Sequence, residues 1–165
     1  MLMLLEKDMF AYDEPYYARL AFQHLMHSER SVKFDTKAFV PLFIEALQLP
    51  ITEEFRSIMG CCKHVQYIDL IANKTGQDFR SHFILHHGLM DLIMNVYDAV
   101  ANNLRDTTVI VRTISIFAVM SPEVRETMFA AGIMRMLERE RSAAGNTTTR
   151  AITILNRNSP YFREA

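Results

Sequence analysis

Apolar residues recur along most of the chain at the three- and four-residue spacing that places them on one face of an α-helix. Some segments carry more apolar residues than one face can hold. In residues 109–120 these are Val109, Ile110, Val111, Ile114, Ile116, Phe117, Val119 and Met120. A helix of this kind is covered on more than one side, as in a stack of helices. The pattern predicts an all-α protein, and 5 Gly and 5 Pro in 165 residues provide few of the turns that a strand-rich fold needs.

Part of this pattern occurs twice near the C-terminus. When residues 112–126 are written above residues 150–164, one Arg, two Ile, a Ser-Pro pair and an Arg-Glu pair coincide. The two Ser-Pro pairs are Ser121-Pro122 and Ser159-Pro160. A hydroxyl followed by a proline is a preferred helix start, because the hydroxyl caps backbone N–H groups and the proline has none to satisfy. We therefore predict that a helix begins at each Ser-Pro pair.

A second element, a small residue followed by pairs of apolar residues, occurs at 38–43, 88–93 and 132–137. Gly88 and Gly132 open the last two copies, and we expect sharp turns there because glycine accepts positive φ. The recurrence lies near the period of roughly 40 to 47 residues of HEAT and armadillo units. A plain helical bundle is the alternative, since it shows the same helical periodicity without true repeats.

Two segments carry a family resemblance. Ala38–Leu47 resembles the Gly-Gly-Ile-Pro-x-Leu-Val-x-Leu-Leu helix of armadillo repeat proteins, and Ala151–Leu155 with Asn158-Ser159-Pro160 is similar to the family's Ala-Leu-x-Asn-Leu helix and the loop behind it. The resemblance implies a short right-handed α-solenoid of about three and a half armadillo-like repeats, in a single domain that spans residues 1–165. The approximate units are 13–50, 51–103, 104–145 and an incomplete 146–165.

The same resemblance implies a partner-binding surface. In the armadillo family, the helix that lines the concave groove often carries an Asn that binds an extended peptide, with a Trp one turn earlier in some members. The Asn position aligns here with Leu70, Ile116 and Ile154, so the Asn ladder is absent. The Trp position aligns with Gln66, Arg112 and Arg150.

These six positions are the predicted partner-binding residues. Two arginines in such a groove suit acidic side chains or carboxylates of a partner protein better than basic peptides. The alternative is that Arg112 and Arg150 are ordinary arginines, either solvated or paired within the chain.

Charge and composition narrow the location and the class of partner. With 18 Lys and Arg against 19 Asp and Glu, the chain has no overall attraction for nucleic acid or anionic membranes. The apolar start, Met1–Leu5, is followed at once by charged residues, unlike a secretory signal peptide, and no apolar run approaches the roughly 20 residues of a membrane span. Adjacent Cys61 and Cys62 are expected to be free thiols of a reducing compartment. We expect a cytoplasmic protein, or a subunit of an assembly formed from cytosolic chains, and not a secreted one.

One cluster contains residue types that bind metals: Cys61, Cys62, His64, His82, His86 and His87. His82 and His86 lie four residues apart on one helix face, a spacing that suits zinc, whereas the simpler alternative is buried cysteines and surface histidines. The sequence contains no Gly-x-Ser-x-Gly elbow, Walker loop or Gly-x-Gly-x-x-Gly turn. We therefore expect no catalytic residues, no metal and no cofactor.

The expected function is a non-enzymatic scaffold or adaptor for protein–protein interaction, or a structural subunit of a larger complex. The chain ends at Ala165, where a further helix should begin. We therefore expect the C-terminal end to dock on another chain, or the sequence to belong to a longer array. The alternatives are a helical-repeat RNA-binding protein, for which only Arg112 and Arg150 recur at the repeat spacing, and an enzyme with an unrecognised site.

Overall fold

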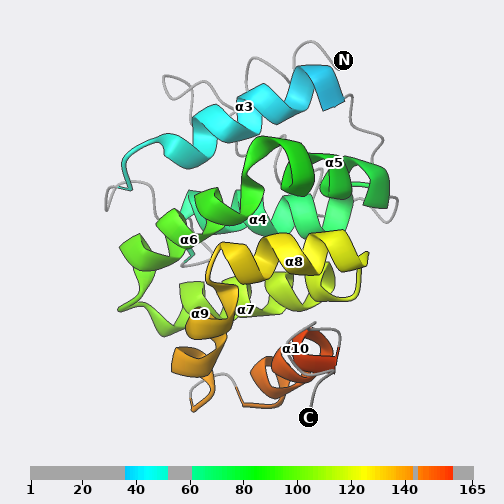
Figure 1. The fold of residues 1–165 in the computed structure, drawn as a ribbon. Helices are drawn as coiled ribbons and strands as arrows, with labels where there is room; N and C mark the ends of the chain where they lie inside the picture. The colour runs from blue at the N-terminus through cyan, green and yellow to red at the C-terminus, as the bar shows by residue number, and fades with distance from the viewer. Residues whose placement is uncertain (1–35, 52–60, 143–144, 158–165) are drawn as a thin grey trace.

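The computed structural model describes residues 36–51, 61–142 and 145–157. These ranges form helices joined by short connections, so the predicted all-α class is confirmed. Figure 1 shows α3 at one end of the molecule and α10 at the other. The helices are α3 (Thr36–Gln48), α4 (Lys63–Lys74), α5 (Gln77–His87), α6 (Leu89–Val100), α7 (Leu104–Ala118), α8 (Pro122–Ala130), α9 (Ile133–Glu140) and α10 (Gly145–Arg157). None of them is long and apolar enough to cross a membrane.

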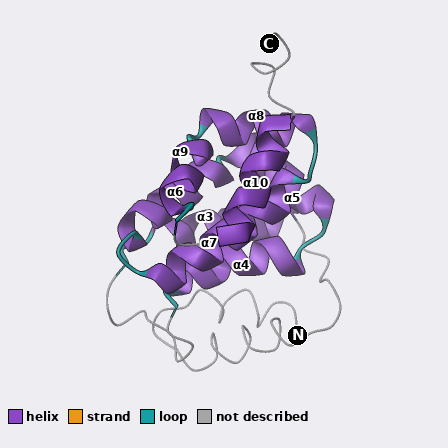
Figure 2. Ribbon diagram, turned by 90° about the horizontal axis from the view of Figure 1, so that it is seen from below, coloured by secondary structure: helices purple, strands orange, loops and turns teal. Residues whose placement is uncertain are grey.

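Helices that are three elements apart in the sequence pack against one another. Helix α4 packs on α7 and α7 packs on α10, while α3 contacts α6 and α5 contacts α8. In Figure 1, α4, α7 and α10 follow one another toward the α10 end of the molecule, and Figure 2 looks along this series from that end. We call these three helices the α4–α7–α10 row.

Two polar contacts join α4 to α7 in this row. The backbone N–H of Cys62, directly before α4, donates to Oδ1 of Asp106 in the first turn of α7 at 2.9 Å. Further along both helices, Nη2 of Arg112 donates to Oδ1 of Asp69 at 2.6 Å. Because these contacts lie at different points along the two helices, they fix the register of α4 on α7.

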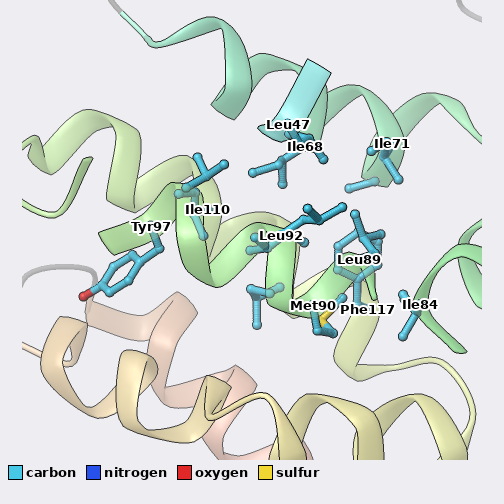
Figure 3. Packing of buried hydrophobic residues seen from close by; sticks show 14 of the residues in the cluster. Leu47, Ile68, Ile71, Ile84, Leu89, Met90, Leu92, Tyr97, Ile110 and Phe117 are labelled. Atoms are coloured by element: carbon cyan, nitrogen blue, oxygen red, sulfur yellow. The ribbon is translucent and has the colours of Figure 1, made fainter. Parts of the chain in front are cut away.

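One hydrophobic core extends through all the described helices. Around Leu89 and Met90 of α6, Figure 3 shows side chains from three other helices: Ile71 of α4, Ile84 of α5 and Phe117 of α7. All five side chains are at most 1% exposed. Full burial of each such side chain contributes about 1.5–3 kcal/mol, so the core is the main source of stability.

Both predicted glycine turns are present. Gly88 has φ 67° between α5 and α6, and Gly132 has φ 82° between α8 and α9. A Cβ at Gly132 would meet no atom within 4 Å, so this position needs glycine for its backbone conformation and not for space. The chain therefore turns from α5 into α6 and from α8 into α9 by the same left-handed conformation.

The predicted helix start at Ser121 is also confirmed. Its hydroxyl accepts a hydrogen bond from the N–H of Val124 at 3.4 Å, and Pro122 is the first residue of α8. The second predicted start, Ser159-Pro160, lies outside the described residues. Asn103 caps α7 in the same way, since its Oδ1 accepts from the N–H of Arg105 at 3.1 Å.

Candidate functional site: a hollow between α7 and α10

A hollow of about 500 Å³ lies where α7 meets α10. It is lined by Arg112, Ser115, Ile116, Val119, Asn146 and Arg150. Three of the six predicted partner-binding residues, Arg112, Ile116 and Arg150, thus meet at one place on the α4–α7–α10 row.

Helical spacing explains how these side chains come together. On α7, Ser115, Ile116 and Val119 follow Arg112 by three, four and seven residues, which is the spacing of a single helix face. On α10, Arg150 follows Asn146 by four residues and shares its face. The hollow is therefore formed where one face of α7 meets one face of α10.

Arg112 is anchored at the edge of the hollow by a short chain of polar contacts. Its guanidinium pairs with Asp69, and 59% of the arginine side chain but only 8% of the aspartate side chain is exposed. Nδ2 of Asn73 donates to Oδ1 of Asp69 at 2.9 Å and to the Asp69 backbone carbonyl at 3.0 Å. Arg112 is therefore paired within the chain by Asp69. Pairing within the chain was one of the alternatives expected for this arginine.

Arg150 differs from Arg112. It is exposed, and among the described residues it takes part in no ion pair. The hollow therefore carries two arginines, of which Asp69 neutralises Arg112, whereas no described residue neutralises Arg150.

The other three predicted positions do not line the hollow. Gln66 is half-buried and donates from Nε2 to the backbone carbonyl of Cys61 at 3.0 Å. Ile154 is partly buried and packs on the core. Leu70 is fully buried, because α4 is packed against α3, α6 and α7, so its side chain offers no surface to a partner.

Three lining residues, Ser115, Val119 and Asn146, were not predicted from the sequence, nor was Asp69 beside the hollow. Ser115 and Val119 could have been found from the helical spacing that starts at Arg112. Asp69 could not, because its position depends on which helix lies beside α7.

A second hollow, of about 460 Å³, lies along α3. Its lining is formed by Val40, Pro41, Ile44, Glu45, Gln48, Leu49 and His87. None of the predicted partner-binding residues lies there.

The cysteines and His64 form a buried polar group at the start of α4. Nε2 of His64 lies 2.8 Å from the carbonyl of Leu49, and Nδ1 lies 3.4 Å from Sγ of Cys62. When the proton is on Nε2, that N–H donates to the carbonyl of Leu49, and Nδ1 accepts from the Cys62 thiol. Burial lowers the pKa of His64 and raises the pKa of the Cys61 thiol, which Asp106 raises further. This environment favours a neutral imidazole and a protonated Cys61 thiol.

Three exposed histidines, His82, His86 and His87, lie in the second half of α5. Nε2 of His82 lies 3.1 Å from Nε2 of His87, and the rings of His82 and His86 have centroids 5.0 Å apart. The contacts thus pair Cys62 with His64, and the three α5 histidines with each other. Within residues 36–51, 61–142 and 145–157, no three His, Cys, Asp or Glu side chains are placed to hold a metal ion.

Comparisons of the chain with protein-family models, curated proteins and solved structures found no match. Function is therefore inferred from the arrangement of the helices and from the chemistry of the hollow.

Proposed function

We propose that the chain is a non-enzymatic protein–protein interaction module, a short armadillo-like solenoid that binds a partner protein on the α4–α7–α10 row. The contacts between helices three elements apart support this architecture. Units of three helices that stack in one direction produce such contacts, since each helix meets its counterpart in the next unit. On this proposal, α4–α6 and α7–α9 are two units and α10 begins a third.

Equivalent arginines give residue-level support to these units. Arg80 is the fourth residue of α5, and its Nη1 donates to the carbonyl of Ala72 near the end of α4 at 2.7 Å. Arg125 is the fourth residue of α8, and its Nη1 donates to the carbonyl of Met120 just after α7 at 2.7 Å. In both units an arginine thus satisfies a carbonyl at the end of the preceding helix.

The observation that carries the proposed function is the composition of the hollow. Val119 is 59% exposed, Ile116 beside it is partly buried against the core, and both line the hollow with Arg112 and Arg150. Exposed apolar side chains next to arginines are typical of surfaces that bind proteins, where arginine is enriched and often contributes much of the affinity.

The same hollow gives less support to the two alternatives. RNA-binding repeats stack bases on aromatic side chains, and none lines this hollow. An acid–base site requires a titratable group near neutral pH, and the lining consists of arginine, serine, asparagine and apolar residues. The hydroxyl of Ser115 donates to the carbonyl of Val111 at 3.1 Å, so no base activates it.

Site-specific photo-cross-linking in extract of the native source tests the proposal. A photo-reactive benzoylphenylalanine replaces Val119 in the hollow, and a matched chain carries it at Asp98, which is exposed on α6. We expect a protein adduct of defined mass from position 119, none from position 98, and loss of the adduct with R150E. Equal labelling at both positions, no adduct, or an adduct removed by ribonuclease would overturn the proposal.

Several expectations stay predictions. They are the right-handed twist, the single domain over residues 1–165, the cytoplasmic location and the docking of the C-terminal end. The last concerns residues 158–165, which lie outside the described residues.

A further inference from the structure

The uncompensated charge of the hollow defines the chemistry of a ligand. An arginine has five N–H donors, and Asp69 accepts from Nη2 of Arg112. Because the Arg112 side chain is 59% exposed, other donors of its guanidinium remain open to solvent. Arg150 adds a positive charge that no described residue pairs with. Together the two arginines and Asp69 leave one positive charge, which one carboxylate would neutralise.

Anchoring makes this site selective. Asp69 is nearly buried and is itself held by Asn73, so the guanidinium of Arg112 is fixed before any ligand arrives. A fixed donor loses little freedom on binding, which favours a ligand that fits its geometry over one that merely carries charge. A phosphate would gain most from two unpaired arginines, whereas here one arginine is already paired.

Apolar contacts lie a short distance from the charged ones. Ile116 and Val119 follow Arg112 by four and seven residues along α7, which corresponds to about 6 and 10 Å along the helix axis. An extended chain covers about 3.3 Å per residue, so two or three residues span that distance. Asn146 is exposed at the opposite wall, and its side-chain amide offers a donor and an acceptor to a peptide backbone.

We infer that the hollow between α7 and α10 binds an acidic–apolar segment of the partner protein, in which an Asp or Glu lies two or three residues from a large apolar side chain. The carboxylate contacts Arg112 and Arg150, and the apolar side chain packs on Ile116 and Val119. This inference rests on the proposed function and names the chemistry of the partner.

Selection from a displayed library of random peptides tests it with the full chain as bait. We expect enrichment of peptides that carry Asp or Glu two or three residues from Leu, Ile, Met or Phe. A synthetic peptide of the enriched sequence, labelled with fluorescein, is then titrated by anisotropy. R150Q should weaken its binding at least tenfold, and R135Q, a matched change of an exposed arginine on α9, should leave it unchanged. Circular dichroism checks that both variants are folded.

A charge-changing variant gives a second readout. D69N removes the negative charge that neutralises Arg112 and raises the uncompensated charge of the hollow from one to two. The affinity for the acidic peptide should therefore depend more steeply on salt in D69N than in the wild type. An unchanged or shallower salt dependence in a folded D69N chain would overturn the inference that uncompensated charge selects the ligand.

Other outcomes separate this inference from the proposed function. Peptides without acidic residues that bind independently of Arg150 but are lost with V119D would overturn the acidic partner and leave the protein-binding hollow intact. Enrichment of basic peptides, or of none, would overturn the inference. A fluorescent single-stranded RNA that binds more tightly than the peptide and is lost with R150Q would also overturn it, in favour of phosphate.

Discussion

Arg112 of α7 and Asp69 of α4 form an ion pair of 2.6 Å in which the arginine is mostly exposed and the aspartate nearly buried. The pair joins two helices that are three elements apart and lies at the edge of the α7–α10 hollow. Its geometry suits it to orient a side chain more than to stabilise the fold, because an ion pair with one solvated partner gains little free energy.

A double-mutant cycle with R112Q and D69N measures this contribution. We expect a coupling energy of about 0.2–1 kcal/mol in the free energy of unfolding from urea titrations. A coupling above about 2 kcal/mol would contradict the small contribution to stability expected of this pair.

Arg80 and Arg125 test whether α4–α6 and α7–α9 are equivalent units. Each donates to a carbonyl at the end of the preceding helix. R80Q and R125Q should therefore destabilise the protein by similar amounts, about 1.5–3 kcal/mol each, as expected for a lost hydrogen bond from a charged group. R135Q on α9 serves as the control and should change stability by less than about 0.5 kcal/mol. One variant destabilised and the other neutral would argue against equivalence.

Tyr97 links α6 to the end of α9. Its hydroxyl donates to Oε1 of Glu140 at 2.7 Å, and burial, followed by that hydrogen bond, raises the pKa of Tyr97 to about 12. The folded state thus holds the phenol proton more strongly than the unfolded state. The stability from this group is complete below the ordinary pKa of about 10 and is lost as the pH rises through about 12.

Absorbance titration at 295 nm, compared between the wild type and Y97F, isolates this tyrosine from the other five. The difference curve should have its midpoint near 12. A midpoint near 10 would mean that the link to Glu140 is absent in solution.

His64 should make the protein sensitive to mild acid. Burial lowers its pKa, so the folded state binds the proton less strongly than the unfolded state. Its contribution to stability is present above about pH 6.5, the ordinary value, and is lost as the pH falls through the lower folded pKa. Urea unfolding at pH 5 and pH 7.5 should show this loss in the wild type and a smaller one in H64Q. The matched variant H86Q, at an exposed position of α5, should behave as the wild type, and equal pH dependence in all three chains would refute the assignment.

Local chemistry explains which features could be predicted from the sequence. The turns at Gly88 and Gly132 and the start of α8 at Ser121 depend on residues adjacent in the chain, and all three were predicted correctly. Arg112 and Arg150 were predicted together because they occupy the same position in the two similar segments 112–126 and 150–164.

The remaining features depend on tertiary packing. Leu70 was predicted to face a partner, but contacts of α4 with three helices bury it. The anchor of Arg112 was missed for the same reason, since Asp69 belongs to a helix whose place beside α7 follows from the whole stack. The similar contacts of Arg80 and Arg125 were also missed, because a Ser-Pro pair precedes Arg125 but not Arg80.

Methyl NMR on the full chain, labelled at Ile and Val, measures most directly where a partner binds. The acidic peptide selected above is added, and the methyl signals of residues in each hollow are followed. Ile116 and Val119 line the α7–α10 hollow, and Val40 and Ile44 line the hollow along α3. We predict that the Ile116 and Val119 signals shift and saturate at one equivalent of peptide, while those of Val40 and Ile44 stay unchanged. Saturable shifts of Val40 and Ile44 with unchanged Ile116 and Val119 would place binding on α3 and contradict the proposed site.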